Sequence, residues 1–213
     1  RLFFQPQEVN STAVNVPIPR FDATRCTGCR KCVEFCHFNA LVYVRQKPML
    51  FPDVCHACGG CALVCPTSAV QEDCRTVGQV EQGRSEDVQV ITGVLNPGES
   101  SAVPVIRAVL RAATNCTGPV VIDCPPGSSC PVMESAAQAD FCLIVAEPTA
   151  FGLHNFRMVY ELTTLLGKPC GVVINKADTP YAPLEDFCAQ QGIPILLHIP
   201  FSNELAAWGA SGR

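Results

Sequence analysis

The chain has 213 residues, of which 48% are hydrophobic and 16% charged, and its formal net charge is −4 at pH 7. These values predict a globular chain with a substantial core and exclude the strongly basic surface typical of nucleic-acid-binding proteins. No run approaches the roughly 18 apolar residues that a membrane-spanning helix requires. We therefore expect neither a nucleic-acid partner nor a membrane span.

The first part of the chain contains a proline-rich segment and then a repeat. Residues 1–19 are interrupted by prolines and indicate an extended segment without helical periodicity. Residues 20–72 form a tandem repeat, because four cysteines recur 29 positions later. Between the two cysteine runs, residues 40–44 and 49–51 predict a short hairpin around residues 45–47.

Both cysteine runs have the spacing C-x2-C-x2-C-x3-C. They comprise Cys26, Cys29, Cys32 and Cys36, and Cys55, Cys58, Cys61 and Cys65. This spacing is typical of ferredoxin-type pairs of [4Fe–4S] clusters, in which the fourth cysteine of each run binds the other cluster. We therefore assign cluster one to Cys26, Cys29, Cys32 and Cys65, and cluster two to Cys55, Cys58, Cys61 and Cys36.

Zinc knuckles or disulfides are the alternatives to these clusters. Paired C-x2-C zinc hooks would leave the third cysteine of each triplet without a use. Pro66 follows the second run as in many ferredoxins, whereas His37 follows the first. Seven further cysteines, an odd number without framework spacing, predict a reducing compartment, which we expect to be the cytoplasm.

From residue 73 onward, short apolar runs alternate with amphipathic stretches. The predicted strands are Val88–Thr92, Val120–Asp123, Cys142–Ala146, Gly171–Asn175 and Ile195–Ile199. The predicted helices are Pro104–Ala113, Val132–Ala139, Leu153–Leu166, Leu184–Gln190 and Asn203–Trp208. This alternation predicts an α/β fold whose mostly parallel sheet has helices on both faces.

Two of the predicted strands end in residues suited to nucleotide chemistry. Ligands of open α/β sheets bind at the carboxyl ends of the strands. Asp123 could hold a Mg²⁺-bound water, and the turn ending at Gly127 could place backbone N–H groups near a γ-phosphate. Asn175 could bind a purine edge with Lys176 beside the base. Each feature has a plainer alternative, namely a polar strand end before a turn at Asp123 and an Asx turn at Asn175.

The chain resembles the MinD-superfamily (MinD/ParA-type deviant P-loop) ATPases that contain an inserted ferredoxin domain. The resemblance rests on the two cysteine runs and on segments in the family's order: VNVPIP, GVLNPGES, VIDCPPGSSCP, AEPTAFGLHNF, GVVINKAD and GIPILLHIPF. It implies that Asp123 is the Walker B/switch II acid, Gly127 a γ-phosphate-sensing backbone position, and Asn175 the adenine contact. Residues 20–72 would be the inserted domain, with residues 1–19 and 73–213 belonging to the ATPase.

One family element is missing from the sequence. No G-x-x-x-x-G-K-[ST] loop occurs, since the Gly167-Lys168 pair is followed by Pro169. In the family this loop would precede Arg1, so we expect a truncated chain that neither binds nucleotide tightly nor hydrolyses ATP. The remaining sheet should then expose apolar surface.

The leading functional hypothesis concerns the complete protein. ATP and Mg²⁺ at a homodimer interface would drive a switch, and the two clusters would serve a redox partner protein or an apo-protein acceptor. Two alternatives are a ferredoxin-type electron carrier with residues 73–213 as a non-catalytic docking scaffold, and a cluster-assembly carrier. Cys130 lies seven residues after Asp123, at an offset comparable to a bridging-cluster ligand of the nitrogenase iron protein. We favour the plainer interpretation of Cys130 as an idle thiol.

Overall fold

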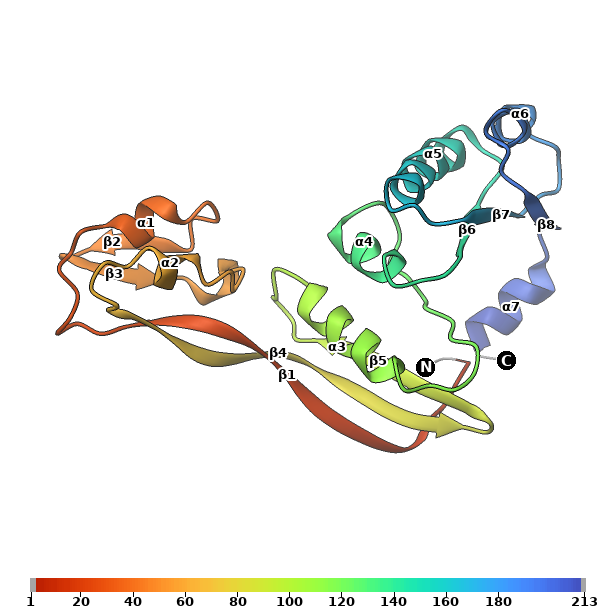
Figure 1. Ribbon diagram of the computed structural model, residues 1–213. Coiled ribbons are helices and arrows are strands. Elements are labelled where there is room, and N and C mark those ends of the chain that lie inside the picture. The colour runs from red at the N-terminus through yellow and green to blue at the C-terminus, as the bar shows by residue number, and fades with distance from the viewer. Residues whose placement is uncertain (1–2, 212–213) are drawn as a thin grey trace. The chain divides into compact units, whose positions relative to one another are not determined.

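The computed structural model describes residues 3–211 and divides into two compact units (Figure 1). The first unit holds residues 6–112, and the second holds residues 113–211 together with residues 3–5. The larger sheet of the first unit is antiparallel, whereas the sheet of the second unit is parallel.

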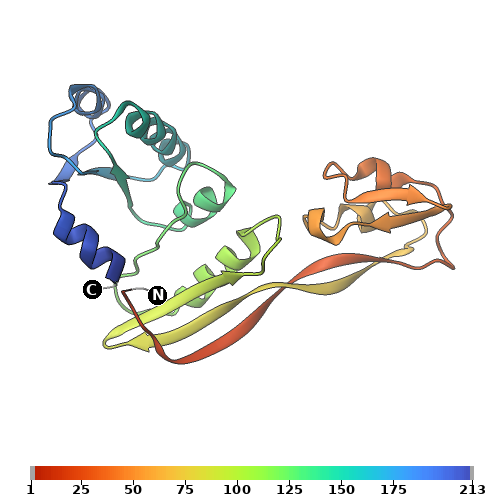
Figure 2. The same ribbon diagram turned by 180° about the vertical axis from the view of Figure 1, so that it is seen from behind.

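A long β-ribbon is the backbone of the first unit. Strand β1 (Gln7–Phe21) pairs antiparallel with β4 (Val70–Ser85) along nearly its whole length, and β5 (Val88–Leu95) pairs antiparallel with the far part of β4. Figures 1 and 2 show the chain running out along β1 and returning along β4. Residues 22–69 are thus inserted at the tip of the β-ribbon.

The tip of the β-ribbon carries a small domain, residues 18–73, which we call the cysteine module. Its further elements are α1 (Lys31–Phe35), β2 (Leu41–Val44), β3 (Lys47–Leu50), the 3-10 helix η1 (Pro52–Val54) and α2 (Gly60–Leu63). The β2–β3 hairpin confirms the predicted one. The hairpin is also the repeat counterpart of the β-ribbon's tip, because Tyr43 pairs with Pro48 as Glu72 pairs with Pro19. The cysteine module thus has two equivalent strand pairs, β2–β3 and the tip of β1–β4. The rest of the β-ribbon is a direct continuation of the second pair.

Helix α3 (Val103–Ala113) packs against the β-ribbon and β5. The buried core of this region consists of Val14, Val16, Val77, Val80 and Val105. Ala57, from the second cysteine run's loop, packs against the same core. The core of the β-ribbon thus reaches the cysteine module.

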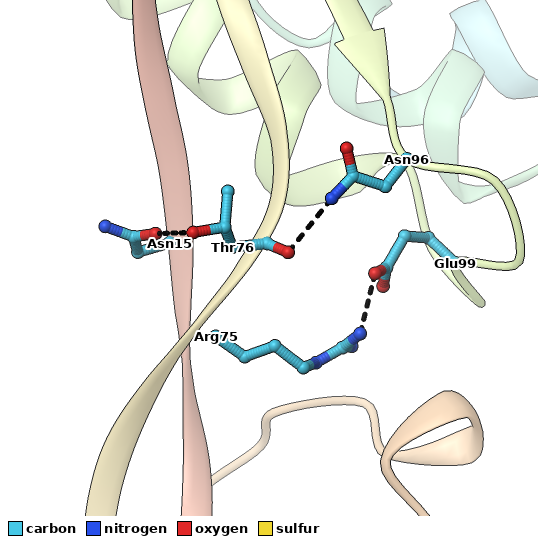
Figure 3. A network of polar contacts seen from close by, with 5 residues as sticks. All are labelled: Asn15, Arg75, Thr76, Asn96 and Glu99. Carbon is cyan, nitrogen blue, oxygen red and sulfur yellow. Dashed lines mark hydrogen bonds and ion pairs between the residues drawn. The ribbon is translucent and has the colours of Figure 1, made fainter.

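Polar contacts tie the segment after β5 to the β-ribbon (Figure 3). Arg75 Nη1 donates to Glu99 Oε1 at 2.6 Å, and Asn96 Nδ2 donates to the Thr76 carbonyl oxygen at 3.1 Å. Thr76 Oγ1 also donates to Asn15 Oδ1 at 2.7 Å, across the two strands of the β-ribbon. These contacts fix residues 96–99 against β4.

The second unit is built on a small parallel sheet with the strand order β6-β7-β8. Its elements are α4 (Cys130–Ala136), β6 (Cys142–Ala146), α5 (Ala150–Leu165), β7 (Cys170–Asn175), α6 (Ala182–Gln191), β8 (Ile195–Ile199) and α7 (Asn203–Ser211). They confirm the helices and strands predicted for this region, apart from the strand Val120–Asp123. The core joins Ile144 of β6 and Val172 of β7 to Phe156 of α5 and Leu184 of α6.

Parts of the predicted α/β layer are wrong. Residues 120–123 do not form a strand, and Val121 is 93% exposed, because no neighbouring strand among residues 3–211 pairs with them. The predicted strand Val88–Thr92 exists as β5, but it turns back at Glu86 and pairs antiparallel with β4. In the described part of the chain, the parallel sheet has three strands, β6, β7 and β8.

One face of that small sheet lacks a cover among residues 3–211. Ile144 and Ala146 of β6 are buried, whereas the alternate residues Leu143 and Val145 are 56% and 61% exposed. Leu197 of β8 is 54% exposed. Apolar surface is thus exposed, as expected from the sequence, and the predicted helices on both faces are not present in this part of the chain.

Both predicted domain boundaries, at residues 19/20 and 72/73, lie inside strands. Strand β1 runs through positions 19 and 20, and β4 runs through positions 72 and 73. Residues 73–112 belong with the β-ribbon in the first unit. Among the described residues, no helix has both the length and the apolar character needed to cross a bilayer.

Candidate metal centre

The backbone of the two cysteine runs follows the repeat. Left-handed backbone conformations occur at matched positions 29 residues apart, at Gly28 and Ala57, Arg30 and Gly59, and Asn39 and Ser68. The middle pair directly precedes α1 and α2, with φ values of 64° and 71°. Because L-residues rarely adopt this conformation, its recurrence shows that the two ligand loops share one backbone design.

Short helices position the third and fourth cysteines of each run. Cys32 lies in α1 and Cys61 in α2. Cys36 directly follows α1 and Cys65 lies two residues after α2, and their N–H groups donate to the Val33 and Ala62 carbonyls at 3.2 and 3.3 Å. The short helix therefore separates the fourth cysteine of each run from the loop that carries the first two.

Two cavities separate the eight cysteines into two groups of four. Cavity one is lined by Phe21, Cys26, Thr27, Gly28, Cys29, Arg30, Cys32, Tyr43, Pro48, Cys65, Thr67, Ala69 and Val70. Cavity two is lined by Pro17, Ile18, Pro19, Phe35, Cys36, His37, Phe38, Ala40, Leu41, Leu50, Cys55, His56, Ala57, Cys58, Gly59, Cys61 and Glu72. Each cavity thus has three cysteines from one run and the fourth cysteine from the other.

The two cavities are repeat counterparts of each other. Every residue that lines cavity one has a partner 29 positions away that lines cavity two. The relation includes the exchanged cysteines, since Cys65 corresponds to Cys36. The donor set of each cavity is therefore four thiols with the spacing that a [4Fe–4S] cluster uses, and the residues present fit that group.

The surroundings raise the pKa of some of these thiols and lower the pKa of another. Desolvation raises the pKa of Cys32, and it raises the pKa of Cys61 to about 11. At Cys65, desolvation also raises the pKa, but hydrogen bonds from Thr67, Ala69 and Val70 outweigh it and leave the pKa below its ordinary value. Iron ligation requires thiolates, so loading must displace protons from Cys32 and Cys61.

The geometry of the eight thiols differs from that of a site for one ion. Among residues 3–211, no group of three or more His, Cys, Asp or Glu side chains converges tightly enough to hold a single metal ion. In a [4Fe–4S] cluster each thiolate binds a different iron, so its four sulfur atoms lie around a cavity and not around one point. The eight cysteines remain the predicted ligands.

The residues predicted to bind nucleotide lie in the second unit. Asp123 is exposed in an irregular segment, and Gly127 follows at an exposed turn with φ of 90°. Asn175 is half-buried at the carboxyl end of β7, as predicted. Lys176 Nζ lies 2.5 Å from Glu147 Oε1 in an exposed ion pair. The strand expected to position Asp123 is absent, so nothing in the described residues aligns Asp123 with the end of β7.

The other cysteines occupy several environments. Cys130 is exposed at the start of α4, and Cys188 is buried in the core of the second unit. Cys142 and Cys170 are free thiols at neighbouring register positions of β6 and β7. Cys124 is exposed, because the strand predicted to end at Asp123 does not form.

Residues 25–70 match the family model of the 4Fe-4S dicluster domain. The cysteine module is a ferredoxin-type iron–sulfur domain.

Two uncharacterized proteins of Methanocaldococcus jannaschii resemble a larger part of the chain. One is 26% identical over 143 residues, which is 66% of this chain and 52% of that protein. The other is 28% identical over 152 residues, which is 71% of this chain and 53% of that protein. The chain thus spans about half the length of these relatives.

The third similarity is restricted to a short segment. The indolepyruvate oxidoreductase subunit IorA of Pyrococcus horikoshii is 34% identical over 58 residues, which is 26% of this chain and 9% of that protein. Because so little of either chain is covered, the similarity concerns a domain and not a whole protein.

Sequence reasoning missed the differences between the cavities. Arg30, Tyr43 and Thr67 line cavity one, and none of their repeat counterparts in cavity two has a similar side chain. Comparing the sequence with itself at an offset of 29 would have revealed these differences.

Proposed function

We propose that the protein is an electron carrier that holds two [4Fe–4S] clusters in the cysteine module. Cys26, Cys29, Cys32 and Cys65 would ligate the cluster of cavity one, and Cys55, Cys58, Cys61 and Cys36 that of cavity two. The observation that carries this proposal is the exchange of the fourth cysteine, since each cavity is lined by three thiols of one run and one of the other. Such exchange is the ligation pattern of two-cluster ferredoxins.

The chain's own residues would hold the clusters and limit their contact with water. Each bound cluster supplies a one-electron carrier. Phe21, Pro48 and Val70 give cavity one an apolar wall, and Leu41 and Leu50 do the same for cavity two. The backbone N–H of Ala69 donates to Cys65 Sγ at 3.2 Å and would stabilise its thiolate.

Anaerobic reconstitution with iron and sulfide tests this proposal. We expect about eight irons per chain and a broad absorption near roughly 400 nm that dithionite bleaches, as for two thiolate-ligated [4Fe–4S] clusters. Stoichiometric zinc without iron under the same conditions would contradict the proposal. Loss of iron to an added apo-protein, in place of stable redox cycling, would favour cluster delivery over electron transfer.

Coupling to ATP is a second proposal, for a longer form of the protein. It is supported by the parallel sheet, by the position of Asn175 at the carboxyl end of β7, and by the similarity to longer proteins beyond the cysteine module. Mg²⁺ near Asp123 and ATP near Gly127 and Asn175, with Lys176 beside the base, would shift a homodimer between two states. The cysteine module would then meet its redox partner or acceptor in one state only.

Thermal unfolding with and without MgATP separates the two proposals. A ligand that binds only the native state raises its melting temperature. We expect no shift for this chain, because it contains no G-x-x-x-x-G-K-[ST] loop, and a clear shift for a longer form that contains one. If the longer form shows no shift, ATP coupling is wrong and the electron-carrier proposal is unaffected.

A further inference from the structure

The two cavities share a backbone design, and several of their matched side chains differ, including Thr27 and its counterpart His56. Three further matched pairs differ in charge or hydrogen bonding. Cavity one has Arg30, Tyr43 and Thr67 where cavity two has Gly59, Glu72 and Phe38. The ligating cysteines themselves do not differ in exposure, because each has the same degree of burial as its counterpart in the other run. The charge and hydrogen bonding of the other lining residues are therefore the differences to compare.

The first difference is one of charge. The Arg30 guanidinium carbon lies 4.4 Å from the centre of the Tyr43 ring, which holds the cation at the wall of cavity one. At cavity two the arginine is replaced by Gly59, and a Cβ on Gly59 would lie only 3.0 Å from Glu72 Oε1. A guanidinium is charged at all physiological pH values. Cavity one therefore has a fixed cation where cavity two has a carboxylate.

The second difference concerns the exchanged cysteine. Thr67 Oγ1 lies 3.8 Å from Cys65 Sγ, within reach of a weak hydrogen bond to sulfur. The counterpart of Thr67 is Phe38, which has no hydroxyl and stacks on His56 with ring centres 3.9 Å apart. Cavity one thus has a side-chain hydrogen-bond donor near its exchanged sulfur that cavity two lacks at the matched position.

Both differences act in the same direction on a bound cluster. Reduction adds one negative charge, which a nearby cation and hydrogen bonds to sulfur favour and a nearby carboxylate opposes. We propose that the cluster of cavity one has the higher reduction potential and takes the first electron, with Arg30 and Glu72 as the main determinants. This inference rests on the proposed occupation of both cavities by [4Fe–4S] clusters. An electron given to the cluster of cavity two would pass to the cluster of cavity one, so the cluster of cavity two would be oxidised and that of cavity one reduced.

A redox titration with dithionite, followed by electron paramagnetic resonance, tests this inference. The unmodified protein and all variants should be titrated in the same buffer at one pH. We expect two one-electron steps, with at least a tenfold difference between the two clusters in the ratio of reduced to oxidised form, equivalent to about 59 mV. A single step for both clusters in the unmodified protein would overturn the inference.

Two substitutions assign the steps. Arg30→Gly removes the cation and suits the left-handed backbone at this position, so it should lower the upper step alone. Glu72→Gln removes the carboxylate charge and should raise the lower step alone. Together they should bring the two steps closer than either substitution does. If both substitutions move the same step, the inference is wrong.

Matched controls exclude a general effect of net charge. Arg45→Gly makes the same change at another left-handed position, in the β2–β3 turn, and Asp73→Asn removes an acid next to Glu72 in the sequence. Neither Arg45 nor Asp73 lines a cavity. Both controls should leave the separation of the steps unchanged, and an equal effect from them would contradict the inference. Absence of iron from the unmodified protein would instead overturn the proposed function, and the inference with it.

Discussion

At the residue scale, Arg75 and Glu99 form a shielded ion pair in the first unit. The side chains are 22% and 8% exposed, and the pair joins β4 to the segment that follows β5. A charge-assisted contact of this kind stabilises more than a pair in open solvent, because removing one partner leaves the other incompletely solvated.

Glu99→Ala should therefore lower the free energy of unfolding by about 2 kcal/mol, measured by urea unfolding followed by circular dichroism. Arg20→Ala is the control, because Arg20 Nη2 donates to Gln71 Oε1 in an exposed contact on the same β-ribbon. We expect the control to cost less than about 1 kcal/mol. Equal losses for the two variants would show that the Arg75–Glu99 pair has no special role.

The residues of the module were the most predictable part of the chain. The spacing of the cysteines is a local sequence pattern, so Cys36 and Cys65 could each be assigned to the cluster of the other run from the sequence alone. In the structure, each of these two cysteines lines the same cavity as its predicted partners. The placement of Asp123 was not predictable in the same way. It depended on a strand, and a strand forms only where another strand pairs with it.

At the element scale, close approach of α3 to the sheet depends on a residue without a side chain. A Cβ on Gly93 would lie 2.7 Å from Val105 Cγ1 and 3.0 Å from Val109 Cγ2, both on α3. Val105 is only 4% exposed, so its side chain has little room to move.

Gly93→Ala should displace α3 and lower the free energy of unfolding by about 1–3 kcal/mol. The same change at Gly118, where nothing lies within 4 Å of the added carbon, should leave stability unchanged or raise it by less than about 1 kcal/mol. Urea unfolding of both variants provides the measurement. A neutral Gly93→Ala variant would mean that α3 is not held against β5 as described.

The longest strand was also the least visible in the sequence. Strand β4 alternates small, polar and charged residues, because much of a two-stranded ribbon faces solvent on both sides. Its composition therefore indicated a boundary near residue 73 and not a strand running through it. By contrast, β6, β7 and β8 are short apolar runs between amphipathic helices, and their prediction succeeded for that reason.

At the scale of the whole molecule, the chain joins a two-fold iron–sulfur module to an α/β unit whose sheet has three strands in the described residues. Leu143 and Val145 are exposed on that sheet, although parallel sheets are normally covered on both faces. A longer form of the protein, as proposed for ATP coupling, would supply the cover. The sequence predicted an α/β unit from local periodicity, but the number of strands depends on contacts that no local pattern records.

The central claim is that each cluster is held by cysteines of both runs, and paired alanine variants test it most directly. Cys26→Ala with Cys65→Ala removes two ligands from cavity one and should leave the other cluster intact, with about half of the [4Fe–4S] resonance signal and about four irons. Cys26→Ala with Cys36→Ala removes one ligand from each cavity, so no site with four cysteines remains and the unmodified signal should disappear. The reverse result, with the signal kept in the second variant and lost in the first, would contradict the account.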